Sequence, residues 1–495
     1  MAPKRNGPPE LDAGHRALMA LNLPPSKVRK VIDTVKEHTV LLDAPAVSRR
    51  NVLRCTNEPA ASLLVQTEVP MKDGSLFKLF YMCPNKLLRQ VLAENSQVAS
   101  VFANMLAAKL GDRIELSLLY TSDETFSGNP LHDSGRKIWV VSYTFLDIPQ
   151  HLRSQTAIWF TPMIVRTKVM QRIAGGASAL FRILLERQLY NPENGLRTVG
   201  LPLSIAGRLY LVHAVFGGLS GDGNNWKLIL ECKGANGLKP CPKCWNVWSR
   251  DSDMAHRLAG HVEISHGIKS AFRLYTAQSL SEQICELKDD ERTYSSTRFK
   301  TLKSLVGFDV SSEGVWGNQA LIDDLKFPES VIFDWVHSLL QDGCFTHEFR
   351  NYVAALPAHS GTDLRNFIDG WRWTDLPFKA ATTKLVRILE GGSFAGHSRP
   401  TASEWLYFCS VLRSWICLSE CEQPGEAKSL MLVLDLIDAI QNAKFTLPHE
   451  KTPDRLAAAI DTAWEAWAQY SDAIHEGDHA KPNHALVGPC WGFRP

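Results

Sequence analysis

The feature that most constrains the fold of this chain is the order of hydrophobic patterns between residues 113 and 221. Three runs with strand character come first, at 113–120, 137–146 and 159–166. A run with helical spacing follows at 178–190, and a fourth strand-like run begins at Arg208. Pro162 interrupts the third run and favours an edge position for it. This order predicts an α/β core built on a mixed sheet.

Beyond residue 245 the strand character is lost and helical spacing dominates. Helices are expected at 278–291, 330–341, 344–355, 378–390, from 400 onward, at 426–443 and at 453–474. We therefore predict four parts. They are a basic, mostly helical N-terminal segment (1–110), the first part of the core (111–245), a helical insertion (246–399), and a helix with a C-terminal helical cap (400–495).

The overall composition is that of a globular protein with a net charge close to zero. The chain has 54 Lys and Arg against 52 Asp and Glu, a net charge of +2, so any grip on nucleic acid must be local. The first residues are polar and Pro-rich, and we find no apolar run of ~18 residues, the length that a membrane span requires. The eleven cysteines suit a reducing compartment. We expect a soluble intracellular protein without a membrane partner.

Residues 1–56 are the most basic part of the N-terminal segment. Ten Lys and Arg oppose five Asp and Glu there, and Ser26 can cap a short helix. The segment could contact DNA, or it could be a solvated amphipathic helix with a tail. Because it matches no zinc-finger or homeodomain pattern, the second interpretation is favoured.

Three carboxylates suggest chemistry: Asp123 follows the first strand, Asp222 follows the fourth, and Glu404 begins a helix. Two-metal phosphoryl transfer needs acidic groups that converge from separate elements on ions ~3.5–4 Å apart. Each residue also has a simpler interpretation. Asp123 could be an acid of a surface turn, Asp222 a turn residue in Gly-Asp-Gly, and Glu404 part of a capping box with Thr401. Glu124, next to Asp123, leaves the first ligand ambiguous by one residue, and we favour Asp123.

A second motif is the pair Cys241-x-x-Cys244, nineteen residues after Asp222. The spacing is that of a zinc knuckle, but a structural zinc needs two more ligands. Four histidines could supply them: His256, His261, His266 and His337. Cys244 followed by His261 and His266 gives C-x2-C-x16-H-x4-H, which is close to a zinc finger. The alternative is two reduced cysteines in a turn.

Basic and aromatic residues are interleaved around these motifs. The basic ones are Arg136, Lys137, Lys227, Lys233, Lys239, Lys243 and Arg250. Together with Trp226 and Trp245 they could follow a DNA backbone, although ordinary solvated faces are an equal alternative. Trp335, Trp371 and Trp373 could stack on unpaired bases, but a buried core position is favoured for them.

Four motifs, in this order, resemble those of the DDE transposases of the CACTA, KDZ and Plavaka kind. The first is an apolar strand leading through Asp123 to an Asn-Pro turn, and the second is Gly-Asp222 followed by Lys-Gly and the CxxC pair. The third is Asp334-x-x-His337. The fourth is Ser-Glu404-Trp at the start of a helix. The resemblance spans about residues 115 to 420.

The resemblance implies a ribonuclease-H-like core interrupted by a helical insertion. It implies an endonuclease and strand transferase in which Asp123, Asp222 and Glu404 hold Mg²⁺ or Mn²⁺. His337, with or without Asp334, would join Cys241 and Cys244 in a structural zinc site. DNA ends, a second copy of the chain and a nuclear location are implied as well. Two alternatives stay open: a catalytically inactive transposon-derived zinc-containing protein that binds DNA or protein, and a nuclease for RNA–DNA hybrids.

Overall fold

The computed structural model describes residues 62–109, 114–126, 137–205, 207–234, 237–249, 252–264, 269–334, 336, 339–340, 343–371, 400–418 and 425–442, with a few positions from 458 to 470. Chain contacts divide it into two compact units. The first comprises residues up to Cys232 together with 277–299 and 308–331. The second comprises 233–276, 300–307 and the chain from Ile332 onward.

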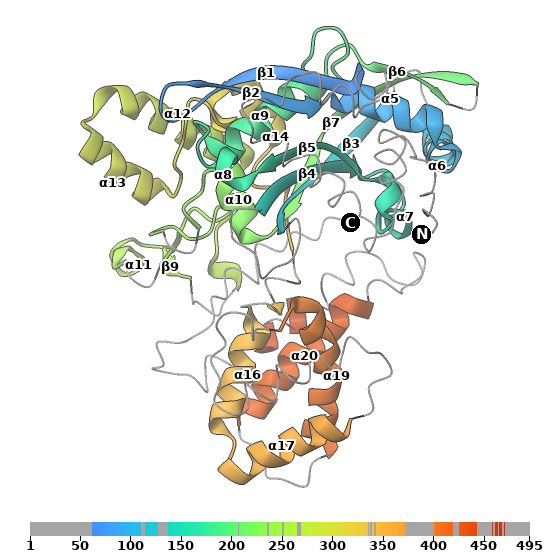
Figure 1. Cartoon of the computed structure of the whole chain (residues 1–495). Helices are drawn as coiled ribbons and strands as arrows, with labels where there is room; N and C mark the ends of the chain where they lie inside the picture. The colour runs from blue at the N-terminus through green and yellow to red at the C-terminus, as the bar shows by residue number, and fades with distance from the viewer. Residues whose placement is uncertain are drawn as a thin grey trace, which may run out of the picture. The chain divides into compact units, whose positions relative to one another are not determined.

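Within the described residues, the largest sheet has six strands and is mixed (Figure 1). Its strands are β3 (Ile114–Phe126), β4 (Lys137–Phe145), β5 (Phe160–Arg166), β6 (Leu201–Ile205), β7 (Arg208–Gly221) and β10 (Val331–Phe333). The order is β10, β7, β3, β4, β5, with β6 paired to β7. β4 runs antiparallel to β3 and β5, whereas β7 is parallel to β3. The edge position expected for the third run from its Pro162 is confirmed by β5.

Helices of the first unit connect and support this sheet. They are α5 (Pro84–Glu94), α6 (Ser96–Ala107), α7 (Gln150–Arg153), η2 (Thr156–Ile158), α8 (Thr167–Met170), α9 (Gly176–Leu189), α10 (Gly223–Ile229), α12 (Ala277–Thr293), η5 (Val315–Gly317) and α14 (Gln319–Leu325). The core forms where α9 meets the sheet. Tyr120 of β3 stacks on Phe216 of β7 at 5.6 Å between ring centroids and meets Phe181 of α9 edge-on at 5.3 Å.

An antiparallel hairpin, β1 (Leu64–Pro70) and β2 (Leu76–Met82), precedes α5. The sequence predicts mostly helix before residue 110, and the hairpin corrects this prediction. Its alternating burial places Val69, Leu79 and Tyr81 inside. The strands therefore form for the usual reason, an apolar face that is covered and a polar face that is wet.

The second unit begins with a small module, residues 233–276. It contains β8 (Val247–Trp248), α11 (Met254–Arg257), β9 (Val262–Glu263) and η4 (Lys269–Ala271). β8 and β9 pair in parallel, and a compact cluster of Cys241, Cys244, Val247, Ile264 and Phe272 is buried beneath them. α13 (Ser296–Val306) crosses the boundary between the units in sequence.

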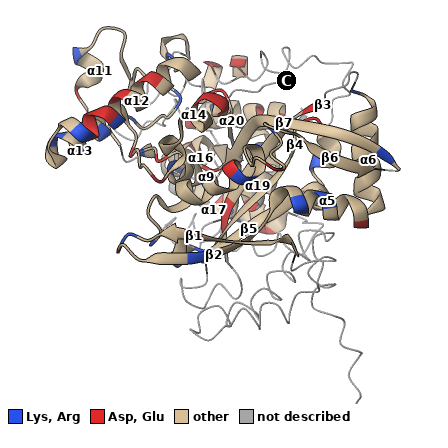
Figure 2. Cartoon of the chain, turned by 90° about the horizontal axis from the view of Figure 1, so that it is seen from above, with Lys and Arg blue, Asp and Glu red and all other residues tan. Residues whose placement is uncertain are grey.

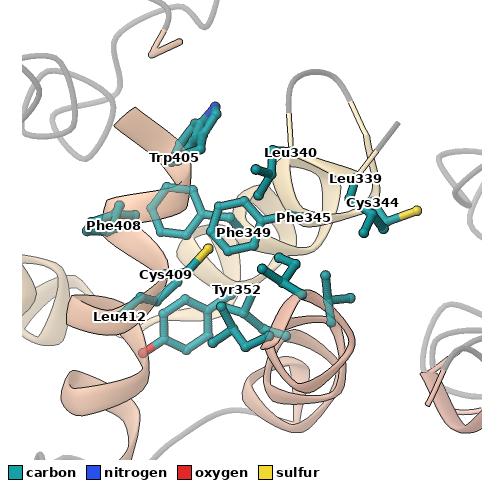
Figure 3. Packing of buried hydrophobic residues seen from close by; sticks show 14 of the residues in the cluster. Leu339, Leu340, Cys344, Phe345, Phe349, Tyr352, Trp405, Phe408, Cys409 and Leu412 are labelled. Carbon is teal, nitrogen blue, oxygen red and sulfur yellow. The ribbon is translucent and has the colours of Figure 1, made fainter. Parts of the chain in front are cut away.

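Among its described residues from 343 onward, the second unit forms the helices α16 (Cys344–Ala355), α17 (Ala358–Gly370), α19 (Ala402–Leu418) and α20 (Glu426–Asn442). Its core is rich in aromatic rings (Figure 3). Phe349 meets Trp405 and Phe408, each at 5.4 Å between ring centroids. The Trp415 indole N–H donates to the Tyr352 hydroxyl at 2.7 Å, so these two buried polar groups satisfy each other within the core.

Most of the expected elements agree with the structure. The helices expected at 278–291, 344–355 and 426–443 correspond to α12, α16 and α20. The helix expected at 330–341 is wrong at its start, because Val331–Phe333 pairs with the sheet as β10. Two segments expected in the helical insertion, 277–299 and 308–331, cluster with the first unit. The helix expected at 378–390 lies outside the described residues.

Candidate active site

Two of the three candidate carboxylates lie at the same end of two neighbouring parallel strands. The register of β3 and β7 ends with the pair Thr121 and Ser220. Two residues further along each strand come Asp123 and Asp222, and the backbone of Asp222 is still extended, with φ −76° and ψ 169°. Because neighbouring strands lie about 4.8 Å apart, continuing the register places the two aspartates opposite each other.

This alignment depends on a β-bulge. Leu118 pairs with Phe216, but the next residue of β3 pairs with Gly218, so Gly217 is an extra residue in β7. If Gly217 were paired and the register before the bulge continued unchanged, Glu124 rather than Asp123 would lie opposite Asp222. The bulge therefore determines which acidic residue of β3 faces the second aspartate.

Glu124 is engaged elsewhere. Its Oε2 forms an ion pair with the Lys137 ammonium at 2.9 Å, and both side chains are about one-third exposed. Asp123 is exposed and lies opposite Val140 of the neighbouring strand β4, whereas Glu124 lies opposite the buried Trp139 of the same strand. Successive strand residues face opposite sides of a sheet. The sequence left the first ligand open between these two residues, and the geometry favours Asp123.

Asp222 is held by the helix that follows it. Its Oδ1 accepts the Asn225 backbone N–H at 2.7 Å, which makes Asp222 the N-cap of α10. The Ser122 hydroxyl donates to the Asn225 side-chain oxygen at 3.0 Å. β3 is thus tied to the first turn of α10, and the two carboxylate-bearing strand ends are fixed to the same helix.

Glu404 caps α19 in the second unit. Its Oε2 accepts the Thr401 backbone N–H at 2.6 Å, and the Thr401 hydroxyl oxygen accepts the Glu404 backbone N–H at 3.3 Å. This is the reciprocal capping box that the sequence offered as the alternative role. Because Glu404 belongs to the other unit, its convergence with Asp123 and Asp222 stays a prediction.

The chemistry of the aspartate pair suits a hard divalent cation. Carboxylate oxygens are the ligands that Mg²⁺ and Mn²⁺ prefer, and two like charges on adjacent strands are relieved by a shared cation. Within the described part of the chain, no group of three or more His, Cys, Asp or Glu is arranged to hold a metal ion. Mg²⁺ is commonly bound through one or two carboxylates, with waters and substrate phosphates completing its shell.

The cysteine pair is buried in the module core. Cys241 is 2% exposed and Cys244 0%, and Cys244 forms an isolated antiparallel bridge with Leu274. His337 and His266 lie outside the described residues, so the zinc set implied by the resemblance stays a prediction. His256 lies in the short helix α11 and is exposed.

The hydrogen bonding of His261 disfavours the finger-like alternative. Its Nδ1 accepts the Trp248 indole N–H at 2.6 Å, and because an indole N–H can only donate, Nδ1 carries no proton. A zinc-bound histidine coordinates through one ring nitrogen and donates a proton from the other. Burial, and then the positive charge of Lys239, lower the pKa of His261, in agreement with a neutral ring.

The basic and aromatic residues near the motifs divide into buried and exposed ones. Trp226 is 1% exposed, so the expectation that it contacts DNA is wrong. Lys239 and Lys243 are buried as well. Burial lowers the pKa of Lys239 to about 8, and its ammonium lies 5.0 Å from the centroid of the Trp248 ring. Trp245 remains 39% exposed.

Of the other basic and tryptophan residues that the sequence suggested for nucleic-acid contacts, some are not described and one packs in the core. Arg136, Arg250, Trp335 and Trp373 lie outside the described residues. Trp371 packs against the helical core, as favoured from the sequence. In Figure 2, α12 carries mainly acidic residues with a few basic ones, whereas α13 carries basic residues only.

Comparison with known proteins adds no identification. No protein family model matches the sequence, and no curated protein matches it either. In the described residues, every helix falls short of the length and apolar character needed to cross a bilayer.

Proposed function

We propose that this protein is a transposase-type endonuclease and strand transferase that cuts and joins DNA phosphodiesters by two-metal catalysis. The observation that carries the proposal is the parallel pairing of β3 with β7 up to Thr121 and Ser220, because Asp123 and Asp222 each follow two residues beyond this last pair. Acidic residues at strand ends are held rigidly, and rigid placement is what metal-dependent phosphoryl transfer needs.

The chain path supports a ribonuclease-H-like core as part of this proposal. Three antiparallel strands (β3, β4, β5) are followed by helix α9, by the short strand β6 and then by β7, which pairs with β3 in parallel. Asp123 lies in β3, and Asp222 directly follows β7. Apart from β6, this is the layout that the sequence pattern predicted for such a core.

Asp123 and Asp222 would hold Mg²⁺ or Mn²⁺, and Glu404 would complete the ligand set. Bound divalent ions supply activation of the attacking oxygen and stabilisation of the leaving oxygen of the phosphodiester. The residues of the chain contribute position: the register aligns the aspartates, and the α10 cap fixes one oxygen of Asp222. Structural zinc on Cys241, Cys244 and His337, DNA ends and a second copy as partners, and a nuclear location belong to the same proposal.

Nicking of supercoiled plasmid DNA with Mg²⁺ or Mn²⁺ tests the proposal. Asp123→Asn and Asp222→Asn should abolish nicking. Asn caps helices about as well as Asp, so Asp222→Asn keeps the α10 cap while removing the charge. Glu124→Gln is the matched control, because Glu124 is paired with Lys137 and should retain activity. Nicking by Asp123→Asn together with its loss in Glu124→Gln would contradict the assignment.

The role of Glu404 can be separated from its capping function. Gln also serves in a capping box, so Glu404→Gln should preserve α19 and abolish nicking if the carboxylate holds metal. Thr401→Ala should do the reverse, with about 1 kcal/mol of helix stability lost and nicking retained. Full nicking by Glu404→Gln would remove Glu404 from the ligand set.

A binding-only protein is the second candidate, and the engagement of the Glu404 carboxylate in a cap favours it. A folded wild-type protein that binds DNA yet never nicks duplex DNA with either metal would establish this alternative. A parallel assay on RNA–DNA hybrids identifies the third possibility, a hybrid-specific nuclease.

A further inference from the structure

The module of residues 233–276 concentrates positive charge. It contains seven Lys and Arg against three Asp and Glu, a net charge of +4, whereas the whole chain carries +2; two of the seven, Lys239 and Lys243, are buried and act on a ligand only through their field. A local excess of this kind is suited to a polyanion. The module has its own small core and its own pair of strands, so the charges belong to one folded element.

Trp245 is the exposed aromatic residue of this module. Its side chain is 39% exposed, whereas the nearby Trp248 is 4% exposed. The Trp245 backbone is fixed on both sides: its N–H donates to the Arg273 carbonyl at 3.0 Å, and its carbonyl accepts the Lys239 ammonium at 2.6 Å. His261 meets the indole ring edge-to-face at 5.2 Å. The ring is therefore presented to solvent from an ordered backbone.

Arg273 lies beside Trp245 and is exposed. Its backbone N–H donates to the side-chain oxygen of Asn246 at 2.8 Å, and the Asn246 amide donates to the carbonyls of Gly260 and Ala271. Asn246 is completely buried, so one side chain ties three loop segments together beneath the surface. Arg273 and Trp245 are thus fixed as neighbours.

We propose that Trp245 and Arg273 form a binding site for a single-stranded polynucleotide, with an unpaired base stacked on the indole and a phosphate bound by the guanidinium. An aromatic platform in a basic setting binds single strands in this way, because every base offers a π-face and every nucleotide carries a charge. Paired bases in a duplex are already stacked and cannot occupy the ring. The proposal adds a partner to the proposed DNA processing but does not rest on its cleavage chemistry.

Fluorescence anisotropy of a labelled 20-nucleotide dT strand with the full-length protein tests the site. Trp245→Ala should weaken binding about tenfold, and Trp245→Phe should retain most of the affinity, because the base stack survives. Arg273→Gln should weaken binding and reduce its salt dependence. Phe80→Ala is the matched control, since Phe80 is 41% exposed and lies in the first unit.

A base analogue separates stacking from simple charge attraction. The fluorescence of 2-aminopurine in the strand should be quenched by the wild-type protein and not by Trp245→Ala, with near-ultraviolet circular dichroism confirming that the variant is folded. Comparison of dT with rU strands shows which sugar is preferred, and Trp245→Ala should weaken whichever binds more tightly. Asp222→Asn should bind single strands normally even if it cannot nick.

Two results would overturn the proposal. One is equal affinity of the wild-type protein, Trp245→Ala and Phe80→Ala for both strands. The other is a wild-type protein that binds neither strand, or that binds duplex DNA more tightly than single strands with no effect of Trp245→Ala.

Discussion

Gly217→Ala is the substitution that most directly tests the alignment of the aspartates. A Cβ at residue 217 would lie 2.8 Å from Ser117 Cβ, 2.9 Å from Leu146 Cδ1 and 3.0 Å from the Leu118 carbonyl oxygen. Two of these atoms belong to, or are bonded directly to, the backbone of β3. The added methyl group therefore forces the two parallel strands apart at the bulge.

Overpacking of this kind costs typically 1–3 kcal/mol. A loss of about 2 kcal/mol lowers the Tm of a unit of this size by roughly 4–8 °C. Nicking should fall by more than the unfolded fraction of the protein explains, because Asp123 and Asp222 follow about five residues further along the two chain segments. Differential scanning calorimetry and the plasmid assay at a temperature well below the transition measure the two effects separately.

Gly223→Ala is the control for this experiment. Gly223 is the first residue of α10, and a Cβ there meets nothing within 4 Å. Replacing a compatible Gly by Ala stabilises a protein by roughly 0.4–1 kcal/mol, so this variant should be as stable as the wild type or more so. If Gly217→Ala behaves like Gly223→Ala in stability and nicking, the bulge does not set the register and the reasoning is refuted.

Three further outcomes are expected. Asn246→Ala should destabilise the module by about 2–4 kcal/mol because three buried hydrogen bonds are lost, and limited proteolysis should cut first within 233–276. Asp324→Asn should speed hydrogen exchange in α14, because the Asp324 carboxylate accepts from Arg197 and Tyr190; unchanged exchange would contradict this role. Mass spectrometry should find one zinc per chain that Cys241→Ser loses; an equal content in both would exclude the cysteine site.

The strands and helices of the core could be predicted because their patterns are local. β3, β4, β5, β7 and α9 each carry enough β-branched, aromatic or helix-spaced residues to be identified alone. Strand β10 could not be predicted in this way. Val331–Phe333 is only three residues long and lies in an apolar run that also fits helical spacing. Its strand state comes from pairing with β7, a segment distant in sequence. Tertiary pairing overrides local preference there.

The β1–β2 hairpin was missed although the sequence carries a signal for it. Asp73-Gly74 separates two alternating runs, and Gly74 adopts a φ of +83°, which favours glycine. β6 shows the same device, with Gly207 at φ +75° in the turn that leads into β7. Asp-Gly and Gly turns between short alternating runs were thus the neglected evidence.

The candidate site shows where sequence reasoning ends. Asp123 and Asp222 were found from their places after strands, but the choice between Asp123 and Glu124 was open. A one-residue shift in register moves every side chain to the other face of a sheet. Here that shift comes from Gly217, an extra residue in the partner strand. No periodicity within β3 contains this information.

The position of Asp222 is supported by residues that lie far beyond it in the chain. α10, which it caps, is anchored by the buried Trp226 and by Leu230, whose carbonyl accepts the Trp316 indole N–H at 2.6 Å. Trp316 lies in the segment 308–331, which rejoins the first unit after the chain has passed through the module 233–276. These contacts, which hold Asp222 and α10 in place, therefore lie within the first unit. We therefore expect changes confined to the module to alter strand binding without moving the aspartate pair, so that the two proposed activities can be tested separately.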